Sequence, residues 1–109
     1  MSADNVNSPA AVVFGCAGLE LTADEKSLFA ECNPSGFILF ARNIENPHQV
    51  RRLIDDLRQS VEYNNPLVLI DQEGGRVQRL TEPHWPKYPS MKAFGDRFAA
   101  DPVEAATCL

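Results

Sequence analysis

The stretch LVLIDQEGGRVQRL, residues 67–80, decides the interpretation of this chain because it joins a strand pattern to a cluster of charges. Apolar residues 67–70 run directly into Asp71-Gln72-Glu73, and a glycine pair and two arginines, Arg76 and Arg79, follow. A continuous apolar run is typical of a strand that is covered on both faces of a parallel sheet. Ligands of parallel α/β folds meet the chain where the strands end, so the pattern predicts a functional site just after Ile70.

Strand and helix patterns alternate ahead of this stretch. Apolar segments begin near residues 11, 37 and 67, so that successive starts are 26 and 30 residues apart. That spacing is the length of a βα unit, and such units form parallel sheets with right-handed crossovers. The sequence therefore predicts an α/β fold that begins with three strand-helix units.

Local signals mark the expected helices. Thr22 and Glu25 have the spacing of a capping box for a helix over 22–32, which the segment Asn33-Pro34-Ser35-Gly36 is expected to break. Asn46 and Pro47 open a second helix. Its apolar face is expected to hold Val50, Leu53, Ile54, Leu57 and Val61, and its end to fall at Asn64-Asn65-Pro66.

The last third of the chain has a different pattern. Residues 81–90 hold three prolines and predict an ordered loop, and residues 91–100 predict a short helix. Asp101 and Pro102 are start signals for another helix. Three parallel strands leave two open edges, and a last helix this short is marginal unless it packs on something, so we expect residues 1–109 to be the front of one larger domain.

Composition and charge exclude several classes of protein. The 109 residues are 44% hydrophobic and 23% charged, with a net charge of −5, as in a soluble globular protein. Only Lys26 of the ten basic residues precedes Arg42, which argues against nucleic acid or an anionic membrane as partner. No apolar run approaches the roughly 18 residues that span a bilayer.

The cysteines indicate a reducing compartment. Cys16, Cys32 and Cys108 have neither a pairing nor a metal-ligand spacing, so we expect small buried residues and no metal. The apolar run before Cys16 has no basic residue ahead of it and is shorter than the ~7–15 residues of an export signal. We therefore expect a cytoplasmic protein.

The charged cluster suits a ligand with many hydroxyl groups. Asp71 can accept two hydroxyl hydrogen bonds, and the glycine pair lets the chain turn back so that Arg76 and Arg79 return positive charge to the strand end. Ion pairs that only brace a loop are an equally open alternative. A phosphate cradle fits less well, because the glycine spacing differs from the known phosphate-binding motifs and two acids lie beside it.

Three segments carry a resemblance to a known family. GFILFARNI, LVLIDQEGGRVQRL and YPSMKAFG, within roughly residues 34–100, resemble successive segments of the bacterial β-N-acetylglucosaminidases of glycoside hydrolase family 3. The string DQEGGRVQR is an unusually specific part of the match. The resemblance implies a (β/α)₈ TIM barrel, of which this chain would form the first three βα units. It also implies a retaining hydrolase without metal or organic cofactor that removes terminal β-linked N-acetylglucosamine from cell-wall fragments (muropeptides) in the cytoplasm.

Carried over by position, the resemblance assigns roles to two residues of the cluster. Asp71 would hold hydroxyls of the non-reducing sugar, and Arg79 would be the second sugar contact. The supporting roles follow from position in the sequence: Arg42, at the end of the second strand, is expected to brace Asp71, with a sugar contact as the alternative, and Glu73 and Arg76 are expected to brace the loop. The histidines, His48 and His84, are expected to face solvent and to pack over the proline-rich loop, respectively.

The catalytic groups of the family have no counterpart in these residues. Its nucleophile is an aspartate late in the barrel, and its proton donor is a histidine paired with an aspartate on a loop after a K-H-F-P-G-H-G-like motif. No such motif occurs here, so the chain would need the remainder of the barrel for activity. Alternatives are a non-catalytic sugar-binding or self-associating module, and a β-glucosidase-like member of the same family.

Overall fold

The computed structural model describes residues 8–108, apart from the side chains at positions 105 and 108. The expectation that Cys108 is buried therefore lies outside the described residues. The chain divides after Ile70 into two compact units. Strands and helices alternate through the first of them, which confirms the α/β class.

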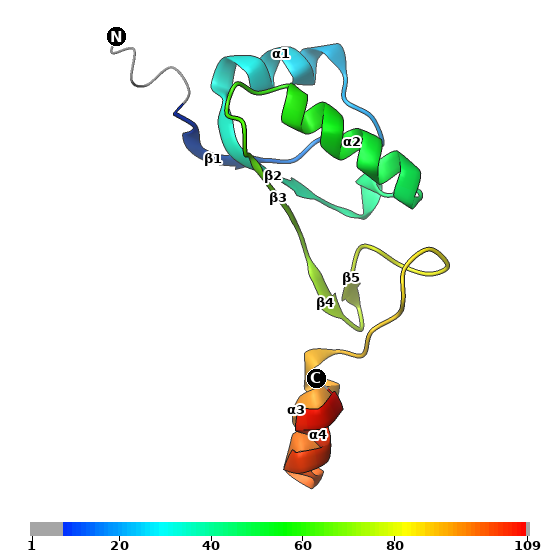
Figure 1. Ribbon diagram of the computed structural model, residues 1–109. Helices are drawn as coiled ribbons and strands as arrows, with labels where there is room; N and C mark the ends of the chain where they lie inside the picture. Colours follow the sequence, from blue (N-terminus) through cyan, green and yellow to red (C-terminus); the bar gives the residue numbers. More distant parts are fainter. Residues whose placement is uncertain (1–7, 109) are drawn as a thin grey trace. The chain divides into compact units, whose positions relative to one another are not determined.

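The first unit is a three-stranded parallel sheet with two helices. Its elements follow the order β1 (Ala10–Phe14), α1 (Ala23–Cys32), β2 (Pro34–Leu39), a 3₁₀ turn η2 (Ala41–Asn43), α2 (Pro47–Gln59) and β3 (Leu67–Ile70). The strands lie in the order β1-β2-β3, and both pairs are parallel, as predicted. Figure 1 shows α1 and α2 on the same side of this sheet.

The core lies between the helices and one face of the sheet. Phe29 of α1 stacks on Phe14 of β1 at 5.8 Å between ring centroids and meets Phe37 of β2 edge-on at 5.0 Å. From α2, Leu53 and Leu57 are 1% and 0% exposed. Burial of such side chains contributes about 1.5–3 kcal/mol each, so this contact surface stabilises the unit.

The opposite face of the sheet is uncovered in the described chain. Pairing of Gly36 with Val13 on one side and with Leu67 on the other puts these residues on the face away from Phe37, and Leu69 joins them two residues on. Val13, Leu67 and Leu69 are 42%, 57% and 44% exposed. The third strand is thus exposed on one face and only partly buried on the other, whereas the sequence predicted burial on both.

Both predicted helix starts are confirmed. The Thr22 hydroxyl accepts from the Glu25 N–H at 3.1 Å, while the Glu25 carboxylate accepts from the Thr22 N–H at 2.9 Å, which completes the capping box. The Asn46 side chain accepts from the Gln49 N–H at 2.9 Å, with Pro47 in the first turn. Each cap satisfies backbone donors that the helix itself leaves free.

Two element ends differ from the prediction. Asn33 adopts a left-handed conformation with φ of 47° and turns the chain straight into β2, so Pro34 to Gly36 belong to the strand instead of a loop. Helix α2 ends at Gln59, and its C-cap residue Ser60 donates its hydroxyl to the Leu57 carbonyl at 2.6 Å. Val61 therefore lies beyond the helix and is not part of its apolar face.

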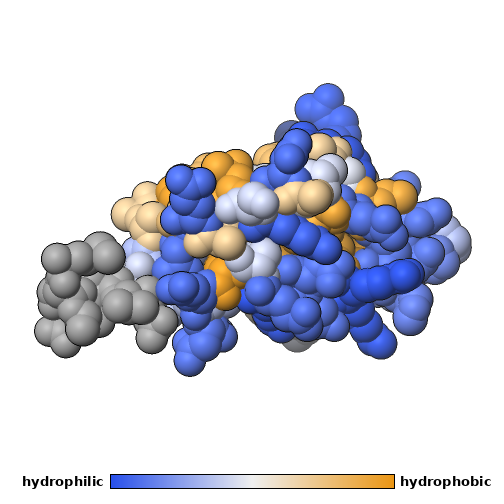
Figure 2. All heavy atoms as spheres, turned by 90° about the horizontal axis from the view of Figure 1, so that it is seen from above, coloured by the Kyte–Doolittle hydropathy of each residue, from blue (hydrophilic) through white to orange (hydrophobic). Residues whose placement is uncertain are grey.

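The outer side of α2 is solvated. Its exposed charged residues are Arg51, Arg52, Asp55 and Arg58. Figure 2 looks from above onto the side of the first unit that carries the helices, and mainly hydrophilic side chains cover it.

The second unit contains a short hairpin, a loop and two helices. Strands β4 (Gln72–Gly74) and β5 (Val77–Gln78) pair antiparallel, and the loop over 79–90 leads to α3 (Met91–Ala100) and α4 (Pro102–Cys108). Both helices were predicted, and the Asp101 side chain accepts from the Glu104 N–H at the start of α4. An ion pair joins Arg97 of α3 to Glu104 of α4. Across residues 8–108, no helix has the length and apolar character needed to cross a membrane.

Candidate functional site

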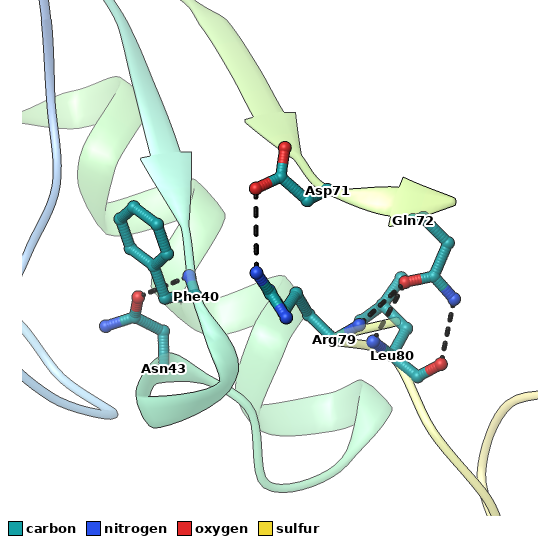
Figure 3. A network of polar contacts seen from close by, with 6 residues as sticks. All are labelled: Phe40, Asn43, Asp71, Gln72, Arg79 and Leu80. Carbon is teal, nitrogen blue, oxygen red and sulfur yellow. Dashed lines mark hydrogen bonds and ion pairs between the residues drawn. The ribbon is translucent and has the colours of Figure 1, made fainter. Parts of the chain in front are cut away.

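The predicted site begins where β3 ends. Asp71 follows Ile70 directly, and its carboxylate Oδ2 lies 3.7 Å from Nη2 of Arg79. Figure 3 shows the two side chains pointing toward each other. The structure therefore brings the two predicted sugar contacts, Asp71 and Arg79, together from the two ends of the β4–β5 hairpin.

The side chains of Asp71 and Arg79 are both accessible to a ligand. The Arg79 and Asp71 side chains are 28% and 49% exposed, and 3.7 Å is longer than a hydrogen bond. An ion pair of this exposure contributes about 0–1 kcal/mol, so neither group is committed to the other. The carboxylate can accept from hydroxyl groups while the guanidinium donates to neighbouring oxygens, which is the chemistry of polyol recognition.

The glycine pair makes the turn of the hairpin. Gly74 and Gly75 have φ values of 87° and 61°, a region that other residues rarely adopt. A side chain at Gly74 would overlap with the Pro89 carbonyl, and one at Gly75 would come within 2.8 Å of Ser90. The Gly75 N–H also donates to the Tyr88 carbonyl at 2.9 Å. Both glycines thus allow the loop to lie against the turn.

Two glutamine side chains hold the backbone around Arg79, and neither was predicted as a site residue. Gln72 Oε1 accepts from the N–H groups of Arg79 and Leu80 at 3.0 Å each, and its Nε2 donates to the Leu80 carbonyl at 2.8 Å (Figure 3). Gln78 Nε2 donates to the carbonyls of Leu80 and Pro86, and its Oε1 accepts from Tyr88 N–H. Their only sequence signal is their place inside the DQEGGRVQR string.

The two predicted loop braces stay without partners. Glu73 and Arg76 are exposed, and within residues 8–108 neither forms an ion pair or a side-chain hydrogen bond. Arg76 instead borders an open concavity of about 400 Å³ whose lining also includes Lys87 and Glu82. Gln72 and Gln78 brace this part of the backbone, and the supporting roles of Glu73 and Arg76 stay predictions.

Arg42 belongs to a polar cluster of the first unit. Its Nε donates to the Cys16 carbonyl at 3.0 Å, and its guanidinium lies 4.8 Å from the centre of the Phe40 ring. Beside it, the fully buried Asn43 accepts from Phe40 N–H at 2.9 Å and donates to the carbonyls of Cys16 and Gly18. The predicted contact of Arg42 with Asp71 stays a prediction.

The remaining candidates have the surroundings expected for surface residues. His48 is exposed at the start of α2, and His84 packs edge-on against Trp85 at 5.8 Å within the loop. Among residues 8–108, no group of three or more His, Cys, Asp or Glu side chains is arranged to hold a metal ion.

The Cys16 thiol, which lies in the polar cluster with Arg42 and Asn43, has a shifted pKa. Removal from solvent raises the pKa of Cys16, the Glu25 carboxylate raises it further, and the Arg42 guanidinium partly offsets both. The thiol is therefore a neutral packing group at physiological pH, which agrees with the structural role predicted for it.

Comparison with known proteins matches the chain to one family. The N-terminal domain of glycosyl hydrolase family 3 matches residues 7–109. The chain is 38% identical over 98 residues to a β-hexosaminidase of Bordetella avium, covering 89% of this chain and 27% of the relative. It is 43% identical over 84 residues to a β-hexosaminidase of Haemophilus influenzae, covering 76% and 23%.

Solved structures agree with the sequence relatives. NagZ from Neisseria gonorrhoeae in complex with N-trifluoroacetyl-D-glucosamine superposes with a TM-score of 0.81 at 30% identity, over 91% of this chain and 28% of that one. A family 3 β-N-acetylglucosaminidase from Paenibacillus sp. str. FPU-7 gives 0.71 at 35% identity, over 87% and 18%. The chain spans about a quarter of the length of the curated relatives that it matches.

Proposed function

Since the chain belongs to glycosyl hydrolase family 3, we propose that it forms the first three βα units of the (β/α)₈ barrel of a retaining β-N-acetylglucosaminidase. The parallel order β1-β2-β3, with both helices on one side, supports this assignment. A complete barrel takes about 250 residues, so 109 residues supply less than half of one.

The uncovered face of the sheet supports a barrel as well. In a (β/α)₈ barrel the helices cover the outside, and bulky branched side chains from alternate strands fill the interior. Val13, Leu67 and Leu69 are side chains of this kind on the face opposite α1 and α2. Further strands would bury them.

Asp71 and Arg79 form the recognition site for the non-reducing sugar. The observation that carries the proposal is the exposed carboxylate at the carboxyl end of β3, with a guanidinium returned to 3.7 Å from it. Active sites of (β/α)₈ barrels lie at this end of the strands. The carboxylate accepts from sugar hydroxyls, and the arginine donates to their oxygens.

The chemical step requires groups outside this sequence. Retaining hydrolysis uses a nucleophile and an acid/base, normally two carboxyl groups about 5–5.5 Å apart. In this family a histidine takes the acid/base role, and neither its motif nor the nucleophile's occurs in the 109 residues. The part played here is orientation of the sugar ring so that its anomeric carbon meets those groups, and neither metal nor organic cofactor takes part.

The substrate is an amino sugar at the end of a chain. A structural neighbour, NagZ from Neisseria gonorrhoeae, binds N-trifluoroacetyl-D-glucosamine, which supports terminal β-linked N-acetylglucosamine as the group removed. Cell-wall fragments such as muropeptides carry this sugar, and we place their hydrolysis in the cytoplasm.

The test uses the complete hydrolase that this chain would begin. We expect Asp71→Ala to lower kcat/KM for a chromogenic N-acetylglucosaminide about 100-fold or more, because the sugar loses its positioning contact. Asp55→Ala, on the solvated side of α2, is the control and should leave kcat/KM unchanged. Unchanged kinetics of Asp71→Ala would remove this residue from the site, and a preference for the matched glucoside would favour the β-glucosidase alternative.

A self-associating module is the second candidate because Val13, Leu67 and Leu69 are exposed. The isolated 109-residue chain would then form a defined dimer in sedimentation experiments and bind N-acetylglucosamine without hydrolysing it. An open reading frame that continues past Leu109 into the family's catalytic motifs would instead support the barrel.

A further inference from the structure

We propose that Gln72 is the positioning residue for Arg79: its side-chain amide fixes the backbone from which the guanidinium reaches Asp71. The inference rests on the proposed sugar site and adds to it a residue that would not touch the sugar. In Figure 3, Asp71 faces the guanidinium of Arg79, and Gln72 faces the backbone of Arg79.

The hairpin ladder ends before Arg79. Strands β4 and β5 pair only at Gln72 with Gln78 and at Gly74 with Val77, with an irregularity between the two pairs. A two-stranded hairpin is marginal by itself even when its ladder is longer. The N–H groups of Arg79 and Leu80 lie beyond the last pair, so strand pairing does not fix this part of the backbone.

The Gln72 amide takes the place of the missing ladder. Its oxygen accepts from both N–H groups at 3.0 Å, and its nitrogen donates to the Leu80 carbonyl at 2.8 Å. A glutamine amide carries no charge and offers both an oxygen that can accept two hydrogen bonds and an NH₂ group that can donate. A glutamate would lose the donor and add a negative charge next to Asp71, and a methionine would lose all of these bonds.

The guanidinium depends on this anchorage because little else holds it. Its contact with Asp71 is 3.7 Å long, beyond hydrogen-bond distance, and the arginine side chain is 28% exposed. Its position is therefore set by where the backbone of residue 79 lies. A displacement of about 1 Å at a positioning contact can lower an enzyme's rate about 100-fold.

Adjacent positions in an extended segment explain why Asp71 and Gln72 can share this task. Successive side chains of a strand point to opposite faces, so Asp71 and Gln72 leave the backbone in different directions. One reaches the tip of Arg79 and the other reaches its main chain. Recognition and support are thus encoded by neighbouring residues at the end of β3.

A double-mutant cycle in the complete hydrolase tests the proposal. We expect Gln72→Met to lower kcat/KM for a chromogenic N-acetylglucosaminide between about tenfold and 100-fold, mainly through KM. In an Arg79→Ala background the same change should have no further effect, because the group that it positions is gone. An undiminished loss in that background would overturn the proposal.

Gln78→Met is the matched control. Gln78 also makes three side-chain hydrogen bonds, but they go to Leu80, Pro86 and Tyr88 and none goes to the N–H of Arg79. Its effect on kcat/KM should therefore be the same with and without Arg79. If Gln78→Met shows the same dependence on Arg79 as Gln72→Met, the role belongs to general loop stability and the proposal is wrong.

The cycle separates the two proposals from each other. If Asp71→Ala and Arg79→Ala both leave kcat/KM unchanged, the sugar site itself is refuted. If both lower kcat/KM but Gln72→Met does not, only the positioning role fails. Should Gln72→Met not fold, Gln72→Asn replaces it in the cycle: its amide is one methylene shorter, adds no charge and cannot keep all three bonds, and its effect should likewise vanish without Arg79.

Discussion

The two units of the chain owe their conformation to different forces. The buried hydrophobic core among positions 8–108 lies before Asp71 and consists of Cys16, Phe29, Phe37, Leu39, Val50, Leu53 and Leu57, with Pro34 and Pro66 also buried. In the described part of the second unit only Gly74 is buried. Its hairpin and loop are shaped by two positive φ angles and by the bonds of Gln72 and Gln78.

This difference separates scaffold from site. Apolar packing fixes the sheet and its helices and leaves each strand end in a defined place. Directional hydrogen bonds shape the segment that follows β3, where the charged and polar groups of the proposed sugar site are exposed. The predictions below compare the two kinds of stabilisation, and the largest expected effect comes first.

Phe29→Ala should cause the largest loss. The ring contacts Phe14 and Phe37 and is 1% exposed, so its removal leaves a cavity in the first unit. We expect the free energy of unfolding, measured by urea titration, to fall by about 3–5 kcal/mol. Leu28→Ala, at the neighbouring position with 46% exposure, should cost about 0.5 kcal/mol or less. Equal losses would contradict a core centred on Phe29.

Gly74→Ala should cause an intermediate loss in the second unit. The residue has a φ of 87°, and a methyl group would overlap with the Pro89 carbonyl. We expect a cost of about 1–3 kcal/mol, seen as faster hydrogen exchange of the amides over 81–90. Gly95→Ala is the control in α3, where nothing lies within 4 Å, and it should stabilise by about 0.5–1 kcal/mol. Unchanged exchange in Gly74→Ala would show that the loop does not depend on this turn.

Helix caps should differ between the units by a smaller amount. Thr22 accepts from Glu25 N–H, and the Glu25 carboxylate also accepts from Ala17 N–H at 2.9 Å, so Thr22→Ala disturbs a reciprocal pair. We expect a loss of about 1 kcal/mol in the free energy of unfolding. Ser90 makes a single bond of 3.3 Å to Ala93 N–H, and Ser90→Ala should cost less. The reverse order would mean that the loop depends on its cap more than the first unit does.

The smallest effect concerns the rate of thiol labelling. Because burial raises the pKa of Cys16, its thiolate fraction at pH 8 is below that of an ordinary cysteine, and iodoacetamide should label it more slowly than the half-buried Cys32. A raised folded-state pKa leaves stability unchanged at neutral pH and lowers it as the pH rises above about 8.5. Peptide mass spectrometry measures both labelling rates, and faster labelling of Cys16 would contradict its burial.

Features with local signals were predictable from the sequence. Helix starts could be predicted because a capping side chain bonds to a backbone N–H within three residues. The caps are Thr22, Asn46 and Asp101. The strands followed from apolar runs, and the place of Asp71 at the end of β3 followed from the third run. These signals depend on neighbours in the chain, which a sequence shows directly.

What the sequence did not reveal depends on contacts at longer range. The hairpin has only two residue pairs, too few to leave an alternating pattern, and it depends on Gln72 reaching positions 79 and 80. Asn43 looks like a loop residue, yet it is fully buried and bonds to a segment 25–27 residues earlier. Uncharged amides carry no periodicity or charge pattern that would mark them, so neither Gln72 nor Asn43 could be predicted as a supporting residue.

The strand order has a consequence for synthesis on the ribosome. Each strand of the sheet pairs with the strand made just before it, so β1, β2 and β3 can assemble in the order in which they emerge, at about 5–20 residues per second. The newest strand always forms the growing edge. While they are uncovered, Leu67 and Leu69 present exposed apolar surface of the kind that makes folding intermediates prone to aggregate.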